Sequence, residues 1–407
     1  MNELYELPNG WEWTKLDDFV TIKGGKRIPK GKKLSENKTP YPYIRVTDFN
    51  DYGSVDLHSI QYVTEDIFNE IKNYIISDND LYISIAGTIG KTGIIPEELN
   101  GANLTENAAK LVFDNEKHSK YFLLYFTNSL PFLEQIGLAT KVVAMPKLAL
   151  VRLKEVYIPL PSLSEQQQIV SKLDLLFQKI DKSIELHQKN MDEANAFMGS
   201  ILNEVFGELD GQYKKEKLEK FDRKMSAGGT PLRAKNEYWD NGTIEWFSSG
   251  ELNQQFTLPA KERITNEGLK NSSAKLFSKG TLLMGMYDTA AMKMSILHTD
   301  ASCNQAIVGI KPNEDELNIF FLKYQLEYLK PKILEERQGV RQQNLNLSKI
   351  KNVEIEFPNI DIQIKVVEYL DSISEKMEKV KTIQKEKMES LKALKASILD
   401  KAFRGEL

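Results

Sequence analysis

The chain contains one long segment twice, and this repeat constrains the fold more than any other feature. The segment from Pro161 to Phe206 aligns without a gap on the segment from Pro358 to Phe403, 197 residues later. Thirteen of the 46 aligned positions are identical, whereas unrelated segments of average composition would share roughly three. So long a period is typical of a duplicated domain with its helix, because solenoid repeats are only about 20–50 residues long.

The repeated segments are predicted to be two long helices that pack on each other. Apolar residues recur every three or four positions in both copies, no proline interrupts them, and each ends near a Gly-Glu-Leu sequence. Ser164 and Asp361 are the predicted N-caps, and each helix would be about 60–70 Å long. A small domain cannot bury so long an apolar stripe. The predicted helix-packing and partner positions are Gln166, Leu173, Leu176, Ile180, Gln363, Leu370, Ile373 and Met377.

Two polar residues, His187 and Gln384, occupy equivalent positions in the middle of the apolar stripe. Polar residues at such a seam can fix the register and orientation of two helices. The alternative is that both side chains point to solvent.

The residues before each long helix predict a mixed α/β domain. A loop and a strand lead into the proline of each copy, and an amphipathic helix with a proline lies further upstream, at 121–136 and 319–336. Short β-rich runs come earlier, at 43–46, 81–86 and 110–113, and again at 244–247, 281–286 and 306–310. The expected boundaries are a first domain at 1–160, a helix at 161–212, a second domain at 213–357 and a helix at 358–407.

Composition excludes several classes of protein. No run of 18 apolar residues is present, and the N-terminal residues lack a secretory signal pattern, so we expect a cytoplasmic protein without membrane spans. The lone Cys303 excludes an internal disulfide and fits a reducing compartment. One cysteine and four scattered histidines predict no metal site.

The segment from Gly87 to Thr92 (Gly-Thr-Ile-Gly-Lys-Thr) resembles part of a phosphate-binding loop. A phosphate-binding loop needs a glycine at the position where this chain has Ile85. It must also be followed by a helix, whereas the pattern of Thr92–Ile95 predicts a strand. We therefore interpret the glycines as a tight turn between two strands, with Lys91 and Thr92 exposed. No methyltransferase tetrapeptide or nucleophile elbow occurs either, so a chain without catalytic activity is expected.

A basic, glycine-containing loop is the strongest candidate for a binding site. Seven basic residues and one acidic residue fall between Lys23 and Lys38, although the net charge of the chain is −4. Positive charge on such a loop suits contacts to DNA phosphates, and the alternative is a solvated surface loop. Weaker candidates lie around Thr230 and in the loop around Arg341, where arginine and glutamine are the side chains that read purine edges. The candidate DNA-binding residues are Lys23, Lys26, Arg27, Lys30, Lys32, Lys33, Arg45, Lys91, Thr92, Lys141, Thr230, Arg233, Lys235, Arg337, Arg341, Gln342 and Gln343.

Several segments resemble one known family. They are the entry Leu7-Pro-Asn-Gly-Trp11-Glu-Trp13, the glycine segment Gly228-Gly-Thr-Pro231, the helix junctions Ile158-Pro-Leu-Pro161 and Phe357-Pro358, and the runs 81–90 and 303–307. Together with the ordered duplication, they resemble the specificity subunit of a type I restriction–modification enzyme. The second helix junction departs from the pattern, because Ile362 stands where the first has Glu165.

The resemblance implies a fold and a function. It implies two pseudo-twofold-related α/β target-recognition domains separated by an antiparallel coiled coil, each reading half of a bipartite, asymmetric site in double-stranded DNA. Two modification (methyltransferase) subunits and restriction subunits would be the partners. They would use S-adenosylmethionine, ATP and Mg²⁺, whereas this chain would bind no cofactor. The alternatives are a scaffold that grips two protein partners and an enzyme with its own nuclease or methylase.

Overall fold

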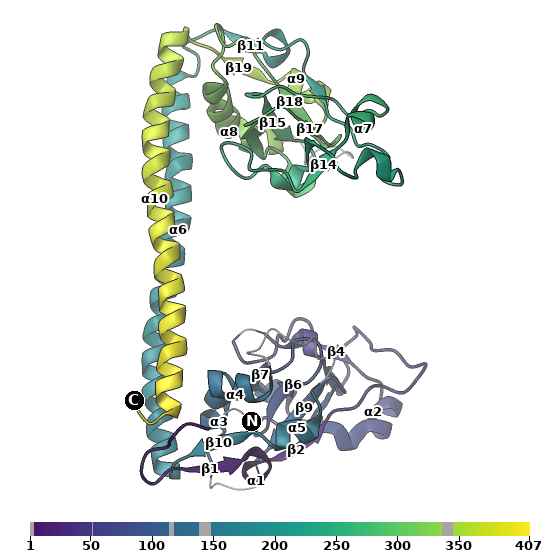
Figure 1. The fold of residues 1–407 in the computed structure, drawn as a ribbon, viewed down its shortest axis with the longest axis vertical. Coiled ribbons are helices and arrows are strands. Elements are labelled where there is room, and N and C mark those ends of the chain that lie inside the picture. The colour runs from purple at the N-terminus through teal and green to yellow at the C-terminus, as the bar shows by residue number, and fades with distance from the viewer. Residues whose placement is uncertain (1–3, 51, 114–117, 138–147, 336–344) are drawn as a thin grey trace. The chain divides into compact units, whose positions relative to one another are not determined.

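The computed structural model describes residues 4–50, 52–113, 118–137, 148–335 and 345–407. The chain divides into two compact units (Figure 1). Unit 1 comprises Met1–Gln188 and Lys385–Leu407, and unit 2 comprises Lys189–Gln384. Each long helix therefore contributes one part to each unit.

Unit 1 is built on two four-stranded sheets, ordered β2-β9-β6-β7 and β4-β3-β8-β5, and a two-stranded sheet of β1 and β10. All pairings are antiparallel except that of β3 with β8. Every residue of β6 is buried, as expected of a strand covered on both faces. The elements are β1 (Glu12–Lys15), α1 (Leu16–Phe19), β2 (Thr21–Gly24), β3 (Pro42–Ile44), η1 (Val46–Asp48), β4 (Gln61–Tyr62), α2 (Glu65–Ile71), η2 (Lys72–Tyr74), β5 (Ile75–Ile76), β6 (Leu81–Ser84), β7 (Thr92–Ile94), η3 (Glu97–Leu99), β8 (Ala102–Leu104), β9 (Ala108–Val112), α3 (Lys120–Thr127), α4 (Leu130–Gln135), α5 (Leu150–Lys154) and β10 (Tyr157–Leu160).

Unit 2 repeats this plan, with sheets β12-β18-β15-β16, β14-β13-β17 and β11-β19. The parallel pairing of its strands β13 and β17 matches that of β3 with β8. The mixed α/β fold in two copies is thus confirmed, and all six predicted β-rich runs contain strands. The elements are β11 (Lys215–Lys217), η4 (Leu218–Lys220), β12 (Ser226–Ala227), η5 (Asn236–Tyr238), β13 (Ile244–Phe247), η6 (Ser249–Glu251), β14 (Glu262–Ile264), α7 (Asn266–Lys270), β15 (Leu282–Gly285), η7 (Asp288–Ala290), β16 (Met294–Ile296), β17 (Ala301–Cys303), β18 (Ile307–Ile310), α8 (Ile319–Glu335), α9 (Leu347–Lys351) and β19 (Glu354–Glu356).

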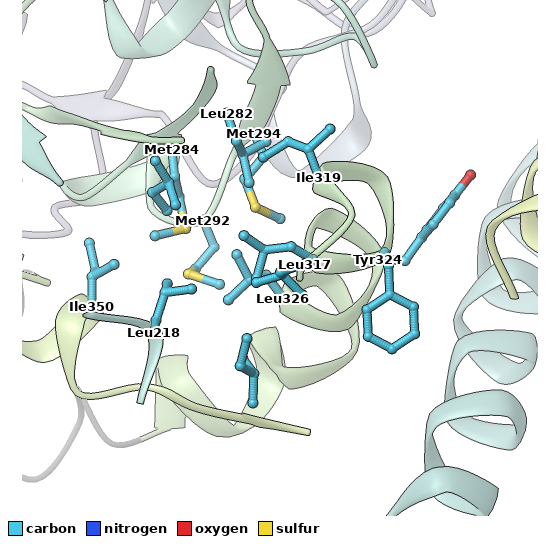
Figure 2. Packing of buried hydrophobic residues seen from close by; sticks show 14 of the residues in the cluster. Leu218, Leu282, Met284, Met292, Met294, Leu317, Ile319, Tyr324, Leu326 and Ile350 are labelled. Atoms are coloured by element: carbon cyan, nitrogen blue, oxygen red, sulfur yellow. The ribbon is translucent and has the colours of Figure 1, made fainter. Parts of the chain in front are cut away.

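The largest core of unit 2 lies between its four-stranded sheet and helix α8. Figure 2 shows side chains of β15 and β16, including Met284 and Met294, facing Leu317 and Leu326. Burying one such side chain contributes about 1.5–3 kcal/mol. This packing fixes the sheet, and with it the loops at the ends of its strands.

The proline-containing helices differ between the units. In unit 1 the predicted helix is broken into α3 and α4, and Pro131 lies in the first turn of α4, where a missing N–H has no cost. In unit 2, α8 continues through Pro331 to Glu335 without a break. The sequence allowed a kink or a break in both copies, and only the first copy is broken.

The two long helices are confirmed as α6 (Leu163–Leu209, 47 residues) and α10 (Ile360–Phe403, 44 residues). The predicted N-caps were wrong by two residues, because Ser164 and Asp361 lie inside the helices. The side chain of Ser162 accepts from the N–H of Glu165 at 3.4 Å, and that of Asn359 accepts from the N–H of Ile362 at 3.1 Å.

The long helices pair in antiparallel fashion within each unit. In unit 1 the ammonium of Lys395 binds Asp181 at 2.8 Å, and Lys172 donates to the carbonyl of Leu407 at 3.2 Å. In unit 2 Asn190 donates to the side chain of Gln384 at 3.4 Å. The predicted positions lie as follows: Gln166, Gln363, Leu173, Ile180 and Leu370 are buried, and Leu176, Ile373 and Met377 are partly buried.

The polar pair in the middle of the stripe lies partly in the helix seam. His187 and Gln384 are both half-buried, and Gln384 accepts the hydrogen bond from Asn190. Neither side chain is therefore fully exposed to solvent.

Candidate nucleic-acid interface

The basic loop of unit 1 follows β2 and is fixed where it begins. The N–H of Gly25 donates to Ala108 O at 2.9 Å, the N–H of Lys26 donates to Leu104 O at 2.8 Å, and the hydroxyl of Tyr43 donates to Lys26 O at 2.8 Å. A Cβ on Gly25 would lie 2.1 Å from the carbonyl oxygen of Thr105, so only glycine allows this approach. The loop is therefore held against the turn between β8 and β9.

The cations of this loop divide into paired and unpaired groups. All seven are exposed. Arg27 forms an ion pair with Glu106 and Lys32 with Asp66. Within the described part of the chain, Lys23, Lys30, Lys33 and Lys38 form no ion pair, and the ammonium of Lys26 lies 5.5 Å from the ring centroid of Tyr74. The ammonium groups of Lys23, Lys30, Lys33 and Lys38 are therefore the ones most available to an anionic partner.

The ion pair with Arg27 affects the pKa of the Glu106 carboxyl group. Partial burial alone would raise the pKa of Glu106. Hydrogen bonds from Arg27, the backbone and Thr105 outweigh that effect, and the pKa is lowered from its ordinary value.

The hairpin loop between β6 and β7 confirms the tight-turn interpretation, because Gly87 and Gly90 have φ values of +77° and +89° and a strand follows. Lys91 is half-buried, and its ammonium donates to Phe49 O at 2.8 Å. The expectation that Thr92 is exposed was wrong. Its side chain is 2% exposed, because β7 packs it inside the unit.

Arg45 also holds the fold together. Its guanidinium donates to both carboxylate oxygens of Asp48, at 3.1 and 2.7 Å, to Gln61 at 2.8 Å and to Ser59 O at 2.7 Å. Asp48 is 1% exposed, so the arginine compensates a buried charge. Arg45 therefore has a structural role in unit 1.

The candidate DNA-binding regions of unit 1 lie at one end of the sheet β2-β9-β6-β7. The N–H of Ile85, where the hairpin loop begins, donates to Asn107 O at 2.8 Å. The N–H of Leu148 donates to Ile85 O at 2.7 Å. The basic loop, the turn at 105–107, the hairpin and the chain at Leu148 therefore share this end. Lys141 lies outside the described residues.

The backbone hydrogen bonds of Gly25, Lys26, Ile85 and Leu148 form a loop frame in unit 1, and unit 2 contains the equivalent hydrogen bonds. The N–H of Gly228 donates to Ile307 O and that of Gly229 to Cys303 O, both at 2.9 Å, and the indole of Trp246 donates to Gly229 O at 3.0 Å. The N–H of Leu345 donates to Met286 O at 3.1 Å, as Leu148 does to Ile85. Arg337, Arg341, Gln342 and Gln343 lie outside the described residues.

The predicted side chains of unit 2 are engaged within the unit. Thr230 donates from its hydroxyl to Gln305. Arg233 binds both oxygens of Glu262 and lies 3.8 Å from the ring centroid of Trp239, and these contacts fix its plane. Lys235 donates to the hydroxyl of Tyr238 at 3.0 Å.

One cation was missed by sequence reasoning. Lys293 occupies in unit 2 the position that Lys91 occupies in unit 1. The carbonyl of Lys91 accepts from the N–H of Ser84, the last residue of β6, and the carbonyl of Lys293 accepts from the N–H of Gly285, the last residue of β15, both at 2.9 Å. Its ammonium donates to Asn253 at 3.1 Å. Aligning the two hairpins on their preceding strands would have found it.

Two further kinds of feature are absent from the described residues. They contain no group of three or more His, Cys, Asp or Glu side chains able to hold a metal ion. Nor do they include a helix with the length and apolar character needed to cross a bilayer.

Comparison with known proteins gives one consistent family. The model of the type I restriction modification DNA specificity domain matches residues 8–195 and 224–387. The EcoBI specificity subunit of Escherichia coli is 29% identical over 57% of this chain, although the match spans only about half (48%) of that protein. The putative MjaX specificity subunit of Methanocaldococcus jannaschii is 26% identical over 96% of this chain and 92% of its own length.

Solved structures share the fold. A structure from work on complex assembly and conformational transition of the type I R-M system has a TM-score of 0.75 and 21% identity, and covers 99% of this chain and 100% of its own. The HsdS subunit from Thermoanaerobacter tengcongensis has a TM-score of 0.51 and 20% identity over 99% of both chains.

Proposed function

The chain belongs to the type I restriction–modification DNA specificity family, and we propose that each of its units reads one half of a bipartite, asymmetric DNA sequence. Its function is recognition of a DNA sequence rather than catalysis. The observation that carries the proposal is the duplicated loop frame, in which the same backbone hydrogen bonds hold different side chains in units 1 and 2. One frame with two sets of side chains suits the reading of two different half-sites.

The phosphate contacts come mainly from the basic loop of unit 1. Lys23, Lys30 and Lys33 are exposed and have no ion-pair partner in the described part of the chain. Binding of phosphates by such lysines releases counterions, which strengthens association and makes it depend on salt.

The partners are two modification (methyltransferase) subunits, joined by restriction subunits for cleavage. The long helices carry exposed apolar side chains, which a docked partner would cover. They are Leu175, Leu186 and Leu394 in unit 1, and Phe197, Ile364, Tyr369 and Ile383 in unit 2, each between 41% and 54% exposed. S-adenosylmethionine, ATP and Mg²⁺ serve those partners, this chain holds no cofactor, and the assembly works in the cytoplasm.

The test is co-expression with the cognate modification subunit, followed by long-read mapping of methylated adenines. We expect a two-part motif with a fixed gap that appears only when this chain is present. If the two proteins co-purify with bound cofactor and no motif appears, sequence recognition by this chain is refuted.

The long helices set the gap between the half-sites in this proposal. Removing one turn from both α6 and α10 should change the number of base pairs in the gap and leave both half-sites unaltered. Altered half-site letters with an unchanged gap would contradict the spacer role.

A further inference from the structure

Arg27 and Glu106 form an ion pair at the end of unit 1 where the loops gather. Arg27 comes from the basic loop after β2, and Glu106 comes from the turn between β8 and β9. The side chain of Arg27 is 76% exposed and that of Glu106 is 23% exposed. Thr105 holds the second carboxylate oxygen of Glu106 at 2.9 Å. The glutamate is therefore anchored, and it orients an arginine that remains open to solvent.

Thr230 and Gln305 occupy the same two positions in unit 2. The N–H of Lys26 binds Leu104 O in unit 1, and the N–H of Gly229 binds Cys303 O in unit 2. Arg27 and Thr230 each follow the donor by one residue, and Glu106 and Gln305 each follow the acceptor by two. In both units a side-chain hydrogen bond joins the two positions. The frame is common to both units, and only the chemistry of the pair differs.

The two pairs offer different hydrogen-bonding patterns. Arg27 is held through its Nε, so its terminal nitrogens can act as a bidentate fork, the arrangement that suits O6 and N7 of guanine. Gln305 is exposed, and its amide can donate to N7 and accept from N6 of adenine. Holding a side chain in one orientation before binding reduces the entropy lost on contact.

We propose that these two pairs are equivalent specificity-determining positions: Arg27, oriented by Glu106, reads a G·C pair in one half-site, and Gln305, oriented by Thr230, reads an A·T pair in the other. This rests on the proposed function, because it names the side chains through which each unit reads DNA. The lysines beside Arg27 supply phosphate contacts around the reading position.

The first test exchanges the pairs within the complex with the modification subunit. R27T/E106Q gives unit 1 the pair of unit 2, and T230R/Q305E does the reverse. Methylation mapping should show one changed base pair in one half-site for each double variant, with the other half-site and the gap unchanged. A methylated motif identical to that of the wild type in both variants would overturn the proposal. A wild-type complex without any motif would instead overturn the proposed function.

A binding test covers the case in which a double variant is inactive. The purified complex carrying R27A or R27K is titrated with duplexes of the mapped site, each with one base pair replaced. The wild type should discriminate at one G·C pair by about 5- to 150-fold. Both variants should lose this discrimination at that pair alone, because lysine keeps the charge but lacks the fork. Equal weakening on every duplex would make Arg27 a phosphate contact and refute the assignment.

Discussion

Gln363 makes in unit 2 the hydrogen bonds that Gln166 makes in unit 1. The side-chain oxygen of Gln166 accepts from the N–H of Ser119 at 3.0 Å, and that of Gln363 accepts from the N–H of Asn318 at 2.8 Å. The amide groups donate to Pro161 O at 3.0 Å and Pro358 O at 2.8 Å. Each buried glutamine thus joins the start of a long helix to the start of another helix, α3 in unit 1 and α8 in unit 2. Gln363 also donates to Glu316 O at 3.0 Å.

We expect Gln166→Leu and Gln363→Leu each to lower the free energy of unfolding by about 1–3 kcal/mol, because both leave buried backbone groups without partners. Gln363→Leu should cost more, since it removes one more hydrogen bond. Urea unfolding measures the loss, and the exposed Gln167→Leu is the control. Equal stability of the buried and exposed variants would show that the glutamines do not anchor the helices.

Replacing Lys23, Lys30 and Lys33 together with alanine should weaken DNA binding by the complex and flatten its salt dependence. The slope of log K against log salt should fall by as much as about 3, because each lost phosphate contact contributes about 0.9. The control removes the exposed Lys376, Lys379 and Lys387 of α10, which changes the net charge equally. A slope equal to that of the wild type would identify the basic loop as ordinary surface.

Stability should fall at alkaline pH because of Tyr125 and Tyr324. Burial, followed by the hydrogen bonds to Asp174 and Asp371, raises the pKa of both phenols above the ordinary 10.0. The folded state then binds the phenolic proton more tightly than the unfolded state, so this stability is complete below about pH 10 and decreases above it.

The measurement is the urea midpoint of unfolding at pH 8 and at pH 10.5. The double variant Y125F/Y324F should show a smaller decrease between the two values than the wild type. The exposed Tyr52→Phe is the control. An equal decrease in all three proteins would place the alkaline sensitivity elsewhere.

Cys303 should resist alkylation in the folded protein. Burial raises the pKa of this thiol to about 12, and the side chain is 0% exposed in β17. At pH 8 a thiol reagent should label the chain only as urea unfolds unit 2, so labelling reports the stability of that unit. Rapid labelling without urea would contradict the buried position.

The helix ends show how far sequence patterns reach. Apolar spacing predicted both long helices, but Ser164 and Asp361 satisfied the residue preference for an N-cap as well as Ser162 and Asn359 did. Likewise, the proline predicted a kink or a break in two helices and did not tell which helix would continue. Residue preferences locate such features only to within a few residues, because tertiary contacts choose between neighbours.

The sequence by itself determined the duplication, the strands, the two long helices and the basic loop, because periodicity and composition are local properties of the chain. Only the tertiary structure decided which cations remain available. Arg233 binds Glu262 from a position 29 residues away, and Arg27 meets Glu106 from a position 79 residues away. The partner of a charged side chain depends on which distant segments the core brings together, and local spacing carries no information about that.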